Sequence, residues 1–132
     1  MGKILIIDDE PAILEYLKKI LAKLGYDTVT ACDGISGCDE AKNPDIKLII
    51  SDLNMPGEMS GISFVRKLRA LRPGCPIIVL TGYPSPDRFK EISEIGAIEF
   101  LTKPFEIPFL SAILKRLLPL DSESGPKASD KK

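Results

Sequence analysis

The amino-acid sequence predicts an α/β fold of the doubly wound type, (βα)5, in which helices cover both faces of a five-stranded parallel sheet. Short apolar runs, typical of strands buried on both faces, alternate with segments whose apolar residues recur every three or four positions. Glycine or proline lies at the start or end of most of the helical segments. Strands and helices that alternate in this way imply right-handed crossovers between parallel strands.

The first strand and the first helix show this pattern most clearly. Residues 3–7 are almost continuously apolar and are followed by two aspartates. The next helix begins at Pro11, a residue favoured in the first turn, and ends at Gly25, a residue favoured after the last turn. Its apolar residues form one stripe: Ile13, Leu14, Leu17, Ile20, Leu21 and Leu24.

The other elements repeat this unit. Four further strands are predicted at residues 27–32, 46–51, 75–80 and 97–102. Four further helices are predicted at residues 34–42, 61–71, 86–95 and 108–118. The last helix is expected to bury one apolar face: Phe109, Leu110, Ile113, Leu114, Leu117 and Leu118. The second helix is weak by propensity, since it holds Gly34 and Gly37.

Length and composition predict one domain. The chain has 132 residues, of which 44% are hydrophobic, enough to build a core without disulfides or metal clips. We expect residues 1–120 to form this domain. Residues 121–132 contain one alanine and no larger apolar side chain, so we expect a disordered C-terminal tail there.

Charge and residue usage exclude several function classes. The net charge of −1 provides no positive field for nucleic acid, and no run of 18 apolar residues could span a membrane. The first residues lack the features of a signal peptide, so we expect a cytoplasmic protein. The three cysteines are scattered, which predicts reduced, buried thiols. With no histidine, the chain has no Ser-His or Cys-His pair, no HExxH metal site and no phosphohistidine of its own.

Polar residues follow the predicted strands at one edge of the sheet. They are Asp8 and Asp9, Asp52, Thr81 and Lys103. Ligands of open parallel sheets bind at this edge, and three carboxylates together favour a bound cation such as Mg²⁺, with phosphate chemistry. Taken singly, these residues also fit helix capping by the aspartates, an ordinary strand threonine and a solvated lysine.

Four segments carry a resemblance to a known family. They are ILIIDDEP at 4–11, IISDLNMP at 49–56, VLTG at 79–82 and FLTKPF at 100–105. In this order and spacing they resemble the receiver domain of bacterial two-component response regulators, including the stand-alone chemotaxis type, over residues 3 to about 118. The resemblance implies a flavodoxin-like fold and a signalling phosphoacceptor that catalyses only its own phosphorylation and dephosphorylation.

The resemblance also implies roles for the acidic residues. Asp52 would be the phosphoacceptor, a carboxylate nucleophile that takes a phosphoryl group from a phosphohistidine. Asp9 would bind Mg²⁺ directly and Asp8 directly or through water. Asp52 and the backbone carbonyl of Asn54 would complete the protein ligands.

A second set of roles concerns the phosphoryl group and the switch. Lys103 would bind one phosphoryl oxygen, and the Thr81 hydroxyl would turn onto another. Gly82 would leave space beside the acceptor, and Phe100 lies where the family carries its rotating aromatic residue. The Lys103–Pro104 peptide would be cis. The loop 57–61 is one residue longer than usual.

The implied partners are a histidine kinase or a histidine phosphotransfer protein, together with a downstream protein that the sequence does not identify. Whether the chain forms a phosphorylation-dependent dimer stays open. So does the choice between a stand-alone regulator and a receiver module of a hybrid histidine kinase or longer regulator. A flavodoxin-like cofactor binder is disfavoured because Asp8-Asp9-Glu10 would repel a bare phosphate. An aspartyl-phosphate phosphatase is also disfavoured, because such an enzyme would carry two aspartates two residues apart after the first strand, and a cap domain.

Overall fold

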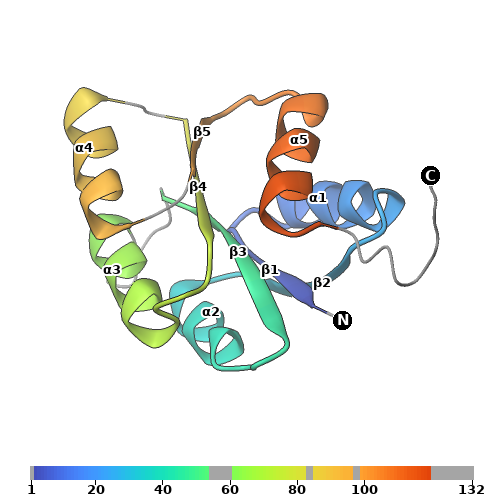
Figure 1. Cartoon of the computed structure of the whole chain (residues 1–132), viewed down its shortest axis with the longest axis horizontal. Helices are drawn as coiled ribbons and strands as arrows, with labels where there is room; N and C mark the ends of the chain where they lie inside the picture. Colours follow the sequence, from blue (N-terminus) through green and yellow to red (C-terminus); the bar gives the residue numbers. More distant parts are fainter. Residues whose placement is uncertain (1, 54–60, 83–84, 97–98, 120–132) are drawn as a thin grey trace.

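The sheet of this protein has five parallel strands in the order β2-β1-β3-β4-β5, with helices on both faces (Figure 1). The computed structural model describes residues 2–53, 61–82, 85–96 and 99–119. The strands are β1 (Lys3–Ile7), β2 (Asp27–Ala31), β3 (Ile46–Asp52), β4 (Ile77–Thr81) and β5 (Glu99–Thr102). The helices are α1 (Pro11–Lys23), α2 (Gly34–Ala41), α3 (Gly61–Leu71), α4 (Pro86–Ile95) and α5 (Ile107–Leu117). The predicted doubly wound fold is confirmed.

The strand ends differ from the sequence prediction by one or two residues, with local causes. The fourth strand begins at Ile77 rather than at residue 75, because the Cys75 N–H donates to the carbonyl of Arg72 in a turn and Pro76 has no N–H. The third strand continues through Asp52, which pairs with Leu80 on β4. Residues 97 and 98 of the predicted fifth strand, and the predicted tail 121–132, lie outside the described residues.

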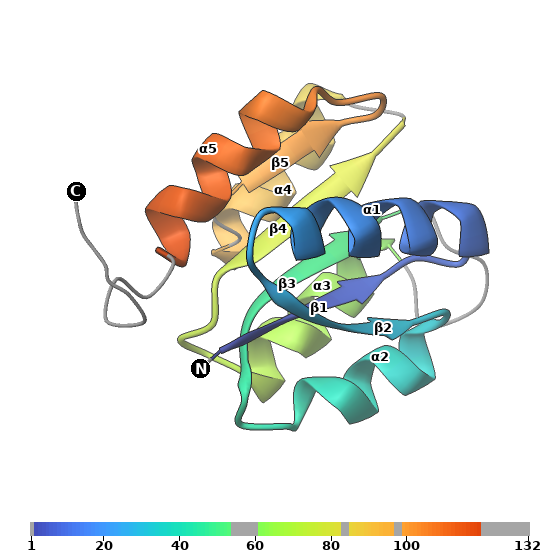
Figure 2. The same cartoon turned by 90° about the vertical axis from the view of Figure 1, so that its right-hand side faces the viewer.

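Alternate residues of the strands pack into two separate core clusters. One cluster joins the sheet to α2, α3 and α4, and the other joins it to α1 and α5, as Figure 2 shows. The strands are therefore covered on both faces, which explains their continuous apolar sequences. None of the helices among the described residues combines the length and the apolar character needed to cross a bilayer.

Two predictions of buried residues are wrong. Phe109 was expected on the inner face of the last helix, but its side chain is 58% exposed. Successive helix residues are about 100° apart, and burial of Leu110, Ile113 and Leu114 leaves Phe109 beside this face. Cys32 was expected to be buried, but it directly follows the edge strand β2 and is exposed, whereas Cys38 and Cys75 are buried.

The register of the strands brings their carboxyl ends to one edge. Ile7 pairs with Ser51, so the residues that follow them, Asp8 and Asp52, lie side by side. Thr81 ends β4 and pairs with Thr102, the residue before Lys103. The candidate residues thus come from β1, β3, β4 and β5 to the same end of the sheet.

Candidate functional site

Three carboxylates meet where β1 and β3 end. One oxygen from each of Asp8, Asp9 and Asp52 lies within 4.8 Å of the others. Asp8 is 0% and Asp52 2% exposed, whereas Asp9 is more exposed. Among the described residues this is the only acidic cluster with the spacing of a metal site.

Lys103 provides a positive charge to this cluster. It follows β5, and its Nζ lies 3.3 Å from Asp8 Oδ2 and 3.3 Å from Asp52 Oδ1. Its backbone N–H donates to the carbonyl of Thr81 over 2.7 Å, and its peptide bond to Pro104 is cis. The ammonium is thereby held between the two buried carboxylates.

The environment of Asp8 opposes its ionisation. Burial raises the pKa of Asp8, and the nearby charge of Asp52 raises it further, more than the Glu10 N–H and Lys103 lower it. The Glu10 N–H donates to Asp8 Oδ1 over 2.9 Å. A raised folded-state pKa means that the stabilising contribution of Asp8 is complete below its ordinary pKa and is lost as the pH rises through the raised pKa. Ionisation of Asp8 is therefore unfavourable in the folded protein, and a bound cation would reduce this cost.

The environment of Lys103, unlike that of Asp8, favours the charged form of the side chain. Burial of the ammonium lowers the pKa of Lys103, but Asp8 and Asp52 together outweigh burial and leave this pKa above its ordinary value. Lys103 is therefore fully protonated at neutral pH. Three acidic groups against one ammonium still leave excess negative charge, which is an environment suited to a divalent cation.

The carboxylate oxygens also fit Mg²⁺ chemically, because this ion prefers hard oxygen ligands and usually takes one or two carboxylates together with water. Asp8, Asp9 and Asp52 are the described residues that could hold it. Asn54, whose backbone carbonyl was the fourth expected ligand, lies outside the described residues, as does most of the longer loop 57–61.

The expected phosphoryl-binding residues lie at the same edge, and the expected switch residue Phe100 lies two residues before the end of β5. Thr81 is fully buried at the end of β4. A Cβ atom at the next residue, Gly82, would meet nothing within 4 Å, so the space beside it is open. Phe100 on β5 is half-buried, and its ring lies 5.7 Å from that of Phe89 on α4 in an edge-to-face contact. Phe89 is 55% exposed.

One contributor to the site was missed by the sequence reasoning: the backbone N–H of Glu10. The hydrogen bond from this group to Asp8 spans two residues, as in the turns that aspartate often forms with its own backbone. The available signal was an aspartate that directly follows a strand and lies three residues before the first helical residue, Pro11.

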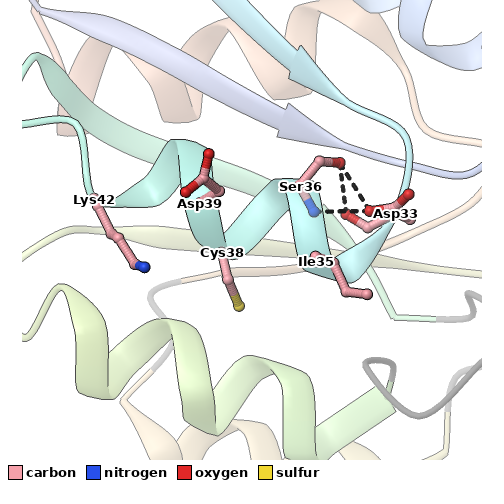
Figure 3. Close-up of a pocket in the computed structure, with 6 residues that line it drawn as sticks. All are labelled: Asp33, Ile35, Ser36, Cys38, Asp39 and Lys42. Carbon is pink, nitrogen blue, oxygen red and sulfur yellow. Dashed lines mark hydrogen bonds between the residues drawn. The ribbon is translucent and has the colours of Figure 1, made fainter.

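A hollow lies along α2, and none of the residues that line it belongs to the acidic cluster. It is lined by Asp33, Ile35, Ser36, Cys38, Asp39 and Lys42 (Figure 3). At its N-terminal end the Asp33 carboxylate accepts hydrogen bonds from the N–H and the hydroxyl of Ser36, each over 2.8 Å. These bonds lower the pKa of Asp33 and fix the start of the helix.

Comparisons with known proteins agree with this geometry. A family model described as the response regulator receiver domain matches residues 4–115. Sporulation initiation phosphotransferase F of Bacillus subtilis is 32% identical over 120 residues, which cover 91% of this chain and 96% of that protein. The chemotaxis protein CheY4 of Vibrio cholerae is 36% identical, with a TM-score of 0.81 over 89% of this chain and 99% of that one.

A third similar protein was solved in a modified state. It is a response regulator protein from Burkholderia pseudomallei with a phosphorylated aspartic acid, a calcium ion and citrate. It is 30% identical, with a TM-score of 0.77 over 94% of this chain and 71% of that one. Other relatives are longer, since the chain spans 55% of the length of one curated protein and 26% of another.

Proposed function

Because this chain belongs to the family of response regulator receiver domains, we propose that Asp52 accepts a phosphoryl group from a phosphohistidine. Receiver domains are signalling phosphoacceptors of two-component phosphorelays rather than classical enzymes. The observation that carries the assignment is the position of Lys103, whose ammonium lies 3.3 Å from the carboxylates of both Asp8 and Asp52. The test is phosphorylation by acetyl phosphate and mapping of the modified residue.

The residues of the site have separate tasks in this transfer. An Asp52 oxygen forms the new bond to phosphorus while the bond from phosphorus to the donor nitrogen breaks. Lys103 lies where its ammonium can pair with a phosphoryl oxygen, and the open side at Gly82 leaves room for the group. Asp8, Asp9 and Asp52 would hold Mg²⁺, as would the Asn54 carbonyl that the family resemblance implies. A bound Mg²⁺ ion would neutralise charge on the transferring oxygens.

The proposed donor is a histidine kinase or a histidine phosphotransfer protein in the cytoplasm. We expect the partners to be proteins, because the net charge of −1 provides no positive field for nucleic acid. The relative of similar length is named as a phosphotransferase of sporulation, and another similar protein belongs to chemotaxis. Both names are consistent with a role in relaying a phosphoryl signal between proteins.

We expect Mg²⁺ to stabilise the native protein through Asp9. A ligand at ten times its dissociation constant stabilises the folded state by about 1.4 kcal/mol. For a domain of this size, that corresponds to a rise in melting temperature of about 5 °C. In Asp9→Ala the rise should fall below about 1 °C, because a metal ligand is lost. Thermal unfolding followed by circular dichroism, with and without Mg²⁺, measures both values.

Asp39→Ala is the control for this experiment, since Asp39 is exposed on α2 and outside the acidic cluster. It should keep the full Mg²⁺ effect. An equal rise in Asp9→Ala and native protein would remove Asp9 from the metal site.

We expect Thr81→Ala to accept phosphate and yet lose much of the conformational response. Two charge-assisted hydrogen bonds, from Thr81 and Lys103, offer about 1.5 to 3 kcal/mol each, and a near-complete two-state switch needs about 5.5 kcal/mol. Loss of the Thr81 bond therefore leaves the switch incomplete. Backbone amide shifts in residues 82–108 should change on phosphorylation of the native protein and change much less in the variant.

The first helix provides the internal reference for these spectra, because α1 packs on the opposite core cluster from α4. Its amides should move little in either protein. Changes confined to the loops around Asp8, Asp9 and Asp52 would show that the signal stops at the site.

A further inference from the structure

Gly37 lies on the buried side of α2, closer to β1 than a side chain would permit. A Cβ atom at this position would lie 2.9 Å from Cδ1 of Ile7 and 3.2 Å from each of its Cγ atoms. Carbon atoms in favourable contact are about 3.5 to 4.0 Å apart. The helix is thus seated on Ile7 at a distance that only glycine allows without movement of a neighbour.

Ile7 has little freedom to move away. It is the last residue of β1, is fully buried, and belongs to the core cluster beneath α2 and α3. Its backbone is paired with Ala31 on β2 and with Ser51 on β3. Protein cores are close-packed. A group pressed against Ile7 therefore forces Ile7 either to change its rotamer or to shift together with the end of the strand.

The residue after Ile7 is Asp8, which is held by three partners. Its N–H donates to the carbonyl of Ala31 over 3.1 Å, Oδ1 accepts from Glu10 over 2.9 Å, and Oδ2 lies 3.3 Å from the Lys103 ammonium. A shift of the strand end therefore moves the Asp8 carboxylate relative to Asp52 on β3. Mg²⁺ demands near-ideal geometry at about 2.0 to 2.1 Å from its ligands, so small displacements matter at this point.

The second helix is also fixed at its start. Asp33 caps its N-terminus through Ser36 (Figure 3), which fixes the point where α2 begins, with two residues between the end of β2 and the first residue of α2. Glycine disfavours a helix relative to alanine, which makes Gly37 an unfavourable choice by propensity alone. The close approach to Ile7 gives a physical reason for its presence.

We propose that Gly37 is a positioning residue for the acidic cluster: its missing side chain lets α2 rest against Ile7 so that Asp8 and Asp9 stay in register with Asp52. The proposal rests on the metal-dependent function assigned to this cluster. Alanine at residue 37 would improve helix propensity while it presses on Ile7. Its effect on stability is therefore the sum of opposing contributions, and metal affinity is the more informative measurement.

The test compares four proteins: native, Gly37→Ala, Ile7→Val and the double variant. Valine lacks Cδ1, the atom nearest to the added methyl group. We expect Gly37→Ala to weaken Mg²⁺ binding by about tenfold, as loss of an outer-shell contact does at other metal sites. Ile7→Val alone should change the affinity by less than about twofold. The double variant should recover much of the lost affinity, because the contact at 2.9 Å is removed while the two contacts at 3.2 Å to the Cγ atoms remain. Isothermal titration with Mg²⁺ measures all four values.

Metal-free amide spectra provide the second readout. The amide signals of Asp8 and Asp9 should shift in Gly37→Ala and move back toward their native positions in the double variant. Gly74→Ala is the matched control, since a Cβ there would meet nothing within 4 Å, and it should leave both readouts unchanged. If Gly37→Ala folds poorly, recovery of folding by Ile7→Val in that background would support the contact.

Two results would overturn the positioning role. One is native Mg²⁺ affinity together with unshifted Asp8 and Asp9 amides in Gly37→Ala. The other is a double variant that remains as impaired as Gly37→Ala. If the native protein binds no Mg²⁺ while the metal-free amides shift and recover as expected, the positioning role is supported and only the proposed function fails.

Discussion

Replacement of Asp52 by asparagine is expected to abolish phosphorylation of the chain by acetyl phosphate in the presence of Mg²⁺. Asparagine has nearly the same shape, but its amide lacks the negatively charged oxygen that attacks phosphorus. Asp52 is 2% exposed and lies 3.3 Å from the Lys103 ammonium, so its carboxylate is already paired with a group that can bind the incoming phosphoryl oxygens. Intact mass measured after donor treatment should rise by one phosphoryl group in the native protein and not in Asp52→Asn.

Asp39→Asn is the matched control, because Asp39 is an exposed carboxylate on α2. This variant should become labelled as fully as the native chain. If Asp52→Asn were labelled to the same extent, the phosphoacceptor would be another residue and the assignment of Asp52 would be wrong.

Replacement of Lys103 by methionine is expected to slow phosphorylation by about 100- to 1,000-fold, the range found when one group that stabilises transition-state charge is removed. Methionine retains much of the length of the side chain but not its charge. The same change should reduce the stability of the metal-free protein, because Asp8 and Asp52 would lose the cation between them. Loss of one partner from a buried pair costs about 3 to 5 kcal/mol. With the Lys103 side chain 22% exposed, we expect about 1 to 3 kcal/mol here.

Urea unfolding in the presence of a chelator measures the stability, and intact mass against time measures the rate. Lys18→Met, on the exposed side of α1, is the control and should match the native protein in both. A variant at Lys103 that becomes phosphorylated at the native rate would show that this ammonium has no part in the transfer.

The alternation of strands and helices along the chain could be predicted from the sequence, because burial on both faces produces continuous apolar strands such as β1 and β3. It also located the candidate residues. Parallel strands share one carboxyl edge, so Asp8, Asp52 and Lys103 could be expected together once their strands were recognised.

Other features depend on tertiary contacts that no local pattern encodes. Phe109 lies beside the buried face of α5 instead of on it, since the rotation of a helix against the sheet is set by packing. Cys32 is exposed because β2 lies at the edge of the sheet. The approach of Gly37 to Ile7 joins residues 30 positions apart, so propensity indicated only a weak helix there.

The function proposed for this site requires the Asp52 carboxylate to take up the phosphoryl group in a Mg²⁺-dependent reaction. Peptide mapping by mass spectrometry after acetyl phosphate treatment tests it most directly, since trypsin separates residues 48–66, with Asp52, from residues 4–18, with Asp8 and Asp9. Borohydride reduction before digestion marks the acyl phosphate. We expect one modified site, at Asp52, when Mg²⁺ is present and none when the metal is chelated. Modification of Asp8 or Asp9 in place of Asp52, or equal labelling of Asp52 in chelator, would contradict the proposed function.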